Sequence, residues 1–382
     1  MPTSTVTVRE GDAAAAQQIA QQAAAVLAGG GLVIFPTETV YGVAASAADS
    51  QALAALRHIK DRPDAQPFTV HLPDPAAAQH YVDLSDRKLK RFLEKVLPGP
   101  VSLVVEVTDQ VIADRIEHLG WSPEARERLY HDNTIGLRCP DHSLALAILG
   151  AVDTPVLVSS ANRHGRRPPQ DAEAAAAEIG AQVDLIVDGG RCRYAKASTV
   201  VKVSGHGPRQ SISILRAGVY DERVIRKLLR WTALFVCSGN TCRSPIAAAL
   251  ARSILAGRLE VAEGDLEAAG RHVVSAGVFA VAGSRASEEA VEAMTRQGID
   301  LARHRSQRLT SQLIHEADVV WCMTDWHRQT VIEMVPSAAA RTHLLDPNGE
   351  IADPMGSGLE TYEHCATAIR GHLEQQLTID QP

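Results

Sequence analysis

The stretch from Trp231 to Pro245 constrains the fold more than any other part of this chain. Residues 231–237, WTALFVC, form an apolar run that is typical of a buried strand. A short polar loop follows, in which Gly239 and Asn240 suit a tight turn. Ser244 and Pro245 then predict a helix start, with Ser244 as the N-cap and Pro245 at the first helical position. The predicted order is strand, loop and helix N-terminus.

The loop between these elements has the chemistry of a phosphate site. Its backbone N–H groups can converge on one anion at the helix N-terminus, next to Arg243. That environment favours the thiolate of Cys237, which is then a nucleophile. The alternative is a buried cysteine that only packs, but strand, turn, arginine and helix start together favour catalysis. The leaving group needs a general acid, and Asp353, before Pro354, is the candidate, although Asp-Pro often marks only a turn.

The six cysteines form no CxxC pair, so the sequence predicts neither a zinc site nor a secreted disulfide framework. Cys237 and Cys242 share one loop and could form a reversible disulfide that protects the nucleophile. The alternative is that Cys242 only packs. The spacing leaves both readings open.

The length of 382 residues predicts two domains. We find no run of about 18 uncharged apolar residues and no basic-then-apolar N-terminal segment, so we expect no membrane span, no signal peptide and a cytoplasmic protein. The net charge of −7 argues against direct, sequence-specific binding of nucleic acid.

In the first half of the chain, several predicted strands end in polar or cationic residues. Thr37 follows the strand 32–35, Arg138 ends the strand 134–138, and Ser160 ends a strand that leads to Asn162. Since ligand loops of open α/β sheets lie at strand ends, we expect these groups to meet in one cleft.

Lys60 and Arg62 alternate in a segment that we expect to be extended, so both could face one side. Such a pair suits a polyphosphate, with arginine as a fork and lysine as a point charge. On spacing alone, a solvated surface pair is the favoured alternative.

Six ordered motifs, PTETVYG (36–42), KxRP (60–63), IGLRxPDH (135–142), SAN (160–162), STVV (198–201) and LRAG (215–218), resemble the YrdC family of threonylcarbamoyl-AMP synthases over residues 8–222. The resemblance implies an open α/β domain with a large cleft. That cleft would take L-threonine, bicarbonate and ATP, with Mg²⁺, and release threonylcarbamoyl-AMP and pyrophosphate. The product would serve a separate tRNA-modifying transferase. Lys60 and Arg62 then become site residues rather than a surface pair.

The resemblance also implies residue roles, with no metal ligand among the side chains. ATP would be bound by Lys60, Arg62, Thr134, Ser160, Asn162 and Arg216. L-threonine would be bound by Thr37, Arg138 and Ser198. Two departures, Gln66 in place of a lysine and the loop Arg163–Arg167 in place of Ser-Gly, concern the affinity for ATP.

Helical and strand patterns alternate after the loop at Cys237. We predict helices at 244–256, 286–297, 325–334 and 358–377, and strands near 272–276, 318–323 and 341–345. Such alternation predicts a small parallel sheet with flanking helices.

The motifs VCxGNxCRSP (236–245), SAG (275–277), GID (298–300) and DP (353–354) resemble the low-molecular-weight protein tyrosine phosphatase family over residues 231–378. Thr241 stands where tyrosine-directed members carry Ile or Leu, which indicates the protein arginine phosphatases within that family. Met355 departs from the aromatic residue often found there.

The resemblance implies that Cys237 attacks phosphorus, that Asp353 is the general acid and that no metal takes part. The phosphate would be held by Arg243 and by the loop residues Gly239, Asn240, Thr241, Cys242 and Ser244. A threonine hydroxyl would narrow the pocket mouth and hydrogen-bond a guanidinium, which favours a phosphoarginine protein as substrate.

We therefore predict a bifunctional enzyme. One alternative is a phosphotyrosine phosphatase fused to a non-catalytic nucleotide- or RNA-binding module. Thiol-dependent arsenate reduction on the same small fold ranks lower, because only Cys322 lies in the region where a shuttle cysteine would be needed.

Overall fold

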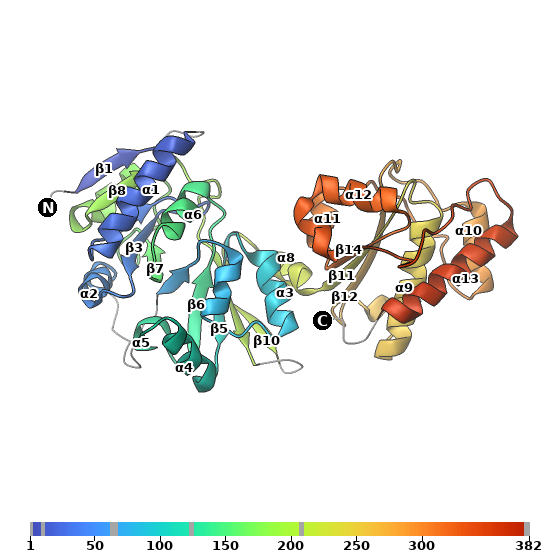
Figure 1. Ribbon diagram of the computed structural model, residues 1–382, viewed down its shortest axis with the longest axis horizontal. Helices are drawn as coiled ribbons and strands as arrows, with labels where there is room; N and C mark the ends of the chain where they lie inside the picture. Colours follow the sequence, from blue (N-terminus) through green and yellow to red (C-terminus); the bar gives the residue numbers. More distant parts are fainter. Residues whose placement is uncertain (1–2, 9–11, 62–67, 122–125, 206–209, 378–382) are drawn as a thin grey trace. The chain divides into compact units, whose positions relative to one another are not determined.

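The computed structural model describes residues 3–8, 12–61, 68–121, 126–205 and 210–377. The chain divides into two compact units, Met1–Ile225 and Arg226–Pro382. The division falls inside helix α8 (Glu222–Leu229). Each unit has its own sheet (Figure 1).

The N-terminal unit contains a ten-stranded mixed sheet among the described residues, in the order β1-β8-β2-β3-β7-β4-β6-β5-β9-β10. The strands are β1 (Ser4–Thr7), β2 (Val33–Phe35), β3 (Gly42–Ser46), β4 (Thr69–His71), β5 (Val101–Glu106), β6 (Thr134–Arg138), β7 (Val156–Ser160), β8 (Leu185–Asp188), β9 (Thr199–Ser204) and β10 (Ser211–Arg216). Parallel and antiparallel pairs are interspersed, as where β6 pairs parallel with β4 and antiparallel with β5.

Helices cover this sheet, and aspartates begin several of them. The helices are α1 (Ala13–Ala28), α2 (Ser50–Ile59), α3 (Arg87–Val96), α4 (Asp109–His118), α5 (Arg126–Leu129), α6 (Ser143–Gly150) and α7 (Ala172–Ile179). The side chains of Asp12, Asp49 and Asp171 each accept a hydrogen bond from a backbone N–H of the first turn, which satisfies donors that the helix leaves free.

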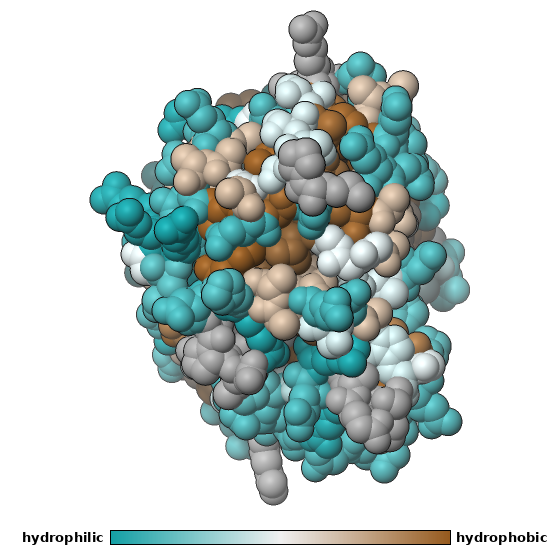
Figure 2. Space-filling view, turned by 90° about the vertical axis from the view of Figure 1, so that its left-hand side faces the viewer, coloured by the Kyte–Doolittle hydropathy of each residue, from teal (hydrophilic) through white to brown (hydrophobic). Residues whose placement is uncertain are grey.

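Helices α1 and α6 pack against each other and against the sheet. Leu27 of α1 and Ile148 of α6 join Phe35 and Val158 of the strands in one buried cluster. Seen from the side in Figure 2, the surface is largely hydrophilic, with one area of apolar residues among the polar ones.

The C-terminal unit is built on a four-stranded sheet with the order β12-β11-β13-β14, in which every pairing is parallel. The strands are β11 (Trp231–Cys237), β12 (Arg271–Gly277), β13 (Val319–Cys322) and β14 (Thr342–Leu344). The helices are α9 (Arg243–Leu259), α10 (Glu288–Arg296), α11 (Ser311–Glu316), α12 (Asp325–Met334) and α13 (Leu359–Gln376). The predicted α/β class is confirmed in both units.

Strand β11 is buried throughout, and all of its residues except Thr232 are apolar, because both of its faces are covered. Phe235 and Cys237 belong to a cluster with helices α9, α10 and α13, whereas Leu234 and Val236 pack with residues of α11 and α12. A parallel strand covered on both sides has no polar alternation. This explains the largely apolar run in the sequence.

Three local predictions were wrong. Helix α9 begins at Arg243, so its N-cap is Cys242 rather than Ser244, and Pro245 is its third residue. The hydroxyl of Ser244 turns instead toward Cys237 and Asn240.

Lys60 is not in an extended segment, as predicted, but caps the C-terminus of α2 in helical conformation. Helix α11 was not predicted, because its six residues are too few for a clear helical period.

Candidate active sites

Cys237 ends β11, between two parallel neighbours, and its thiol faces the start of α9. The Sγ atom lies 2.9 Å from Ser244 Oγ, and the backbone N–H of Asn240 donates to it at 3.2 Å. We call residues 237–243 the Cys237 loop. The loop wraps around the sulfur so that donors point at it, which is the arrangement that stabilises a thiolate.

Asn240 holds the Cys237 loop together from inside. It is fully buried and adopts a left-handed conformation with φ of 56°, whereas Gly239 has no positive φ. Its Nδ2 donates to Ser244 Oγ at 2.9 Å and to Ser275 Oγ at 2.8 Å. Its Oδ1 accepts from the backbone N–H of Gln307 at 2.9 Å. One side chain thus connects the loop, helix α9 and strand β12.

Gly277 allows β12 to approach the Cys237 loop closely. A Cβ atom at this position would lie 2.7 Å from both Asn240 N and Ser238 O. Side-chain carbons do not occupy such distances, so only glycine fits without moving the loop backbone. Ser275 and Gly277 belong to the SAG motif, whose contacts with the loop could not be inferred from its spacing.

Arg243 and Asp353 meet although 110 positions separate them in the chain. Arg243 Nη2 forms an ion pair with Asp353 Oδ2, and Nη1 donates to the carbonyl of Ile351 at 3.1 Å. Arg243 is buried, whereas the side chain of Asp353 is 43% exposed. The predicted general acid, Asp353, therefore lies between solvent and the buried guanidinium of Arg243, which is predicted to bind the phosphate.

A histidine that sequence reasoning missed contacts the same loop. His327, in the first turn of α12, lies with Nε2 3.0 Å from Ser238 Oγ and with Nδ1 2.6 Å from Thr324 Oγ1. Burial first, and then the charge of Arg243, lower the pKa of His327 to about 4. A neutral ring therefore orients Ser238 at neutral pH. The only feature of the sequence that could have indicated a role for His327 was its position in the predicted helix that follows the strand ending at Cys322.

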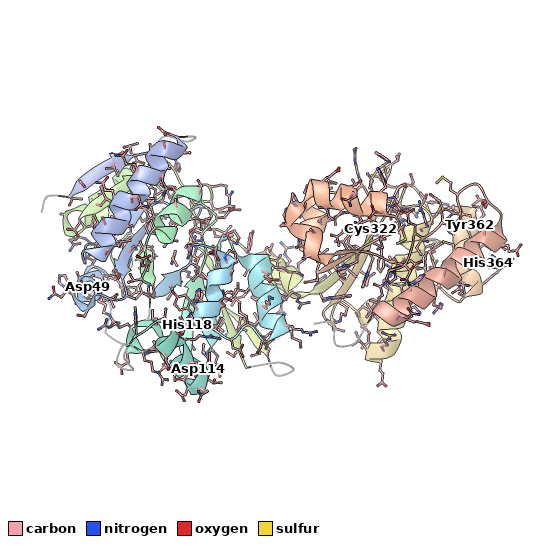
Figure 3. All side chains as sticks on the ribbon, in the orientation of Figure 1. Asp49, Asp114, His118, Cys322, Tyr362 and His364 are labelled. Atoms are coloured by element: carbon pink, nitrogen blue, oxygen red, sulfur yellow. The ribbon has the colours of Figure 1, made fainter. Side chains whose placement is uncertain are left out.

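The thiol of Cys242 is surrounded by hydroxyl groups. Its Sγ lies 3.4 Å from Tyr362 Oη, 3.5 Å from Ser287 Oγ and 3.6 Å from Thr241 Oγ1. Burial and the contact with Cys242 raise the pKa of Tyr362, which projects from α13, to about 12 (Figure 3). Cys237 and Cys242 are both free thiols, and their reversible disulfide stays a prediction.

Cys322, the residue on which the arsenate alternative depends, is fully buried at the end of β13 (Figure 3). Burial raises the pKa of its thiol far above the usual range. A thiol kept protonated in an apolar strand is a poor shuttle nucleophile.

The N-terminal unit has a pocket of about 250 Å³ over one face of its sheet, which we call the Arg138 pocket. The predicted site residues that line it are Thr37, Thr134, Arg138, Ser160, Ser198 and Arg216. The predicted groups thus meet in one pocket, but the expectation that they meet at strand ends was wrong. Thr134, Gly136 and Arg138 line the pocket along the whole of β6, and alternate residues of a strand lie on one face of the sheet.

Arg138 is fixed at the floor of this pocket by residues of the PTETVYG motif. Its Nη2 pairs with Glu38 Oε1 at 3.0 Å and donates to Thr39 Oγ1 at 2.6 Å. Both charged side chains are buried. Glu38 and Thr39 stood in the quoted motif, but their role as partners of Arg138 was missed, because 100 positions separate the two segments.

Arg216 approaches the Arg138 pocket from β10, and among the described residues its hydrogen-bond partner is the uncharged Ser198. Its Nη2 donates to Ser198 O at 2.9 Å and to Ser198 Oγ at 3.3 Å, and Ser198 Oγ lies 2.9 Å from Ser102 Oγ. Burial first, and then the charge of Arg138, lower the pKa of Arg216. Two guanidinium groups that repel each other across one pocket favour an anionic ligand.

Lys60 lies behind the pocket wall rather than in its lining. Its Nζ donates to the carbonyl of Ser160 at 2.8 Å and to that of Asn162. The side chain of Asn162 in turn donates to the carbonyls of Arg163 and Arg166, which shapes the loop after β7. The structure thus brings Lys60, Ser160 and Asn162 together. Arg62 and Gln66 lie outside the described residues.

Within the described ranges, His, Cys, Asp and Glu side chains nowhere gather in a group of three or more that could hold a metal ion. In the same ranges, we find no helix with the length and apolar character required to span a bilayer.

Two family models match this chain. The Sua5_yciO_yrdC model, described as "Telomere recombination", matches residues 25–218. The LMWPc model, "Low molecular weight phosphotyrosine protein phosphatase", matches residues 232–380.

Curated relatives match each part separately. A "Protein-arginine-phosphatase" of Geobacillus stearothermophilus is 40% identical over 37% of this chain and 87% of its own length. "Threonylcarbamoyl-AMP synthase" of Bacillus subtilis is 32% identical over 50% of this chain and 51% of its own length. The protein of the same name in Pyrococcus abyssi is 28% identical over 56% and 60%. The chain therefore spans about half the length of these two synthases.

Proposed function

Because the chain belongs to the Sua5_yciO_yrdC family over residues 25–218 and to the low-molecular-weight phosphotyrosine protein phosphatase family over residues 232–380, we propose that it is a bifunctional enzyme. The N-terminal unit is a threonylcarbamoyl-AMP synthase. The C-terminal unit is a cysteine-dependent protein phosphatase.

The synthase reaction joins L-threonine, bicarbonate and ATP in the Arg138 pocket. The threonine amine and bicarbonate form a carbamate with loss of water, a carbamate oxygen attacks the α-phosphorus, and the bond to pyrophosphate breaks. The presence of two guanidinium groups, those of Arg138 and Arg216, in the lining of one pocket is the observation that carries this proposal, because they offset negative charge on the reactants.

Ligand roles in the pocket follow the sequence expectation. Thr37, Arg138 and Ser198 hold threonine, and Glu38 keeps the guanidinium of Arg138 in position. The residues assigned to ATP are Lys60, Arg62, Thr134, Ser160, Asn162 and Arg216. Among the described residues, no carboxylate lines the pocket, so Mg²⁺ would enter with the phosphates of ATP and neutralise their charge. The product would pass to a separate tRNA-modifying transferase.

The phosphatase reaction takes place at the Cys237 loop. The Cys237 thiolate attacks phosphorus and forms an S–P bond, while the bond to the leaving group breaks. Arg243 and the loop amides stabilise the equatorial oxygens, and Ser244 donates a hydrogen bond to the thiolate. Asp353 protonates the leaving nitrogen or oxygen and then accepts a proton from the water that cleaves the S–P bond. The contacts of Cys237 Sγ with Ser244 and Asn240 carry this proposal.

Phosphoarginine is the proposed substrate of the phosphatase. Thr241 is a half-buried residue of the Cys237 loop, and its hydroxyl can accept a hydrogen bond from a guanidinium. The relative from Geobacillus stearothermophilus, which this chain matches over 87% of that relative's length, is named a protein-arginine-phosphatase, and this supports the same choice. Phosphotyrosine is the alternative.

An assay of both activities on one preparation tests the bifunctional proposal. We expect release of pyrophosphate that depends on threonine and bicarbonate, and hydrolysis of p-nitrophenyl phosphate. Lys60→Ala should lower the first activity at least tenfold, since the loop after β7 loses its tether, and leave the second unchanged. Cys237→Ser should abolish only the second.

Lys90→Ala, on the exposed face of α3, is the matched control for Lys60 and should retain both activities. Absence of threonine-dependent pyrophosphate release from the wild type would reject the synthase and favour a non-catalytic nucleotide- or RNA-binding module. Hydrolysis by Cys237→Ser at the wild-type rate would reject the phosphatase site.

A further inference from the structure

Two large aromatic side chains are exposed in the C-terminal unit and stack on each other. Phe279 is 67% exposed and Trp326 is 48% exposed. Their ring centroids are 5.4 Å apart with an interplanar angle of 30°. We call this pair the Phe279–Trp326 stack. Aromatic rings held in water next to each other are typical of a surface that binds a partner.

The stack is attached to the Cys237 loop on both sides. Phe279 follows β12 and Trp326 follows β13, the two strands that flank β11 in the sheet. The backbone N–H of Phe279 donates to Ser238 O at 2.9 Å. The ring of Trp326 packs edge-on against His327, 5.1 Å between centroids, and His327 contacts Ser238 Oγ. The aromatic faces therefore lie beside the residue that follows the nucleophile.

Carboxylates border the stack. Asp325 precedes Trp326, and Glu350 Oε1 accepts the backbone N–H of Asp325 at 2.7 Å. Arg328 neutralises Asp325, and Arg243 neutralises Asp353. Glu350 is exposed, and among the described residues it pairs with no lysine or arginine. The surface around the Phe279–Trp326 stack thus combines two aromatic faces with the negative charge of Glu350, which no lysine or arginine among the described residues neutralises.

Resting on the proposed phosphatase function, we propose that the Phe279–Trp326 stack and Glu350 bind a lysine or arginine side chain next to the phosphorylated residue of a protein substrate. A cation over an aromatic face is attracted by the ring quadrupole, and tryptophan is the strongest such partner. Glu350 adds an ion pair to the same cation. An apolar flanking residue would use the rings but not the carboxylate.

Peptides that differ at one flanking position test the proposal. Phosphoarginine and phosphotyrosine peptides are made with lysine, or with its uncharged analogue norleucine, on each side of the phosphorylated residue. Wild type should cleave the lysine peptides with a kcat/KM about fivefold higher, the factor expected for one exposed cation–π contact. p-Nitrophenyl phosphate, which has no flanking residue, reports the chemistry alone.

Trp326→Leu and Glu350→Gln should each reduce the preference for lysine to less than about twofold, with p-nitrophenyl phosphate hydrolysis retained. Met334→Leu, a change of another exposed apolar residue on α12, is the matched control and should keep the preference. Equal or faster cleavage of norleucine peptides by wild type would overturn the proposal. Failure of wild type to hydrolyse p-nitrophenyl phosphate would instead reject the phosphatase function on which it rests.

Discussion

Asn240 determines the shape of the Cys237 loop through bonds that alanine, or even aspartate, could not make. Its amide donates to Ser244 and Ser275 and accepts from Gln307, and its backbone takes the left-handed conformation that asparagine tolerates best among non-glycine residues. A buried group with all of these bonds satisfied is rigid. The loop is therefore held in shape before any ligand binds.

Thr241, the next residue, is expected to decide between the two phosphatase substrates. Thr241→Ile removes a hydroxyl that can bond a guanidinium and offers an apolar surface to a phenol ring. We expect the ratio of kcat/KM for phosphoarginine over phosphotyrosine peptides to fall about tenfold, the value of one hydrogen bond to a charged group. Thr241→Ser, which keeps the hydroxyl, should retain the ratio. An unchanged ratio in the isoleucine variant would remove the reason for choosing arginine.

At the scale of elements, the phosphatase site depends on how closely β12 approaches the Cys237 loop. The approach at Gly277 is tight against backbone atoms of Ser238 and Asn240, and these cannot rotate away as the end of a side chain could. The catalytic geometry is therefore built by the packing of a strand against a loop.

Gly277→Ala should lower kcat/KM for p-nitrophenyl phosphate at least tenfold, because the added Cβ forces the loop backbone to shift. Gly257→Ala, in α9, is the control, since a Cβ there meets nothing within 4 Å. That variant should retain activity and gain roughly 0.5–1 kcal/mol of stability. Full activity of Gly277→Ala would show that the loop adapts at little cost.

At the scale of the whole molecule, the three hydrophobic clusters found among the described residues each belong to one unit. The cluster around Phe35 and Leu27 lies within the N-terminal unit, and those around Phe235 and Leu234 lie within the C-terminal unit. Each core is thus formed from its own contiguous stretch of chain. We expect the stability of each unit to respond to its own buried titratable groups.

His71, buried on β4 beside Arg138, should make the N-terminal unit sensitive to acid. Burial and the charge of Arg138 lower its pKa from 6.5 to about 3. Between these values the unfolded chain binds the extra proton, so the free energy of unfolding should fall as pH drops below 6.5, by up to about 1.4 kcal/mol per pH unit. Above pH 6.5 this effect is absent.

Urea unfolding at pH 7.5, 6 and 5 checks this prediction, because these values lie on both sides of ~pH 6.5, where histidine titrates. Unfolding is followed by chemical labelling of the thiol of Cys139, which is buried in the folded unit. His71→Gln, which cannot titrate, should show a smaller loss of stability on acidification. His164→Gln, at an exposed position, should behave like wild type. The same pH dependence in wild type and His71→Gln would assign the acid sensitivity to other groups.

The sequence by itself determined the features that depend on neighbours in the chain. The apolar run 231–237, the turn at Asn240 and the alternation of helices and strands are properties of short segments, and the structure has them within a few residues. The predicted fold class and both family resemblances were confirmed on this basis. The predicted cap at Ser244 was wrong because its hydroxyl has a stronger competing partner in the loop.

Only the tertiary structure decided which distant groups meet. Glu38 with Arg138, Asp353 with Arg243, and the exposed Phe279–Trp326 stack beside Ser238 all join separate segments. Such contacts depend on the order of strands in each sheet. In the parallel C-terminal sheet this order brings the carboxyl ends of neighbouring strands to one edge, and in the mixed N-terminal sheet it places residues of oppositely directed strands on one face. Local sequence patterns carry no information about that order, since pairing is chosen by the burial of the whole core.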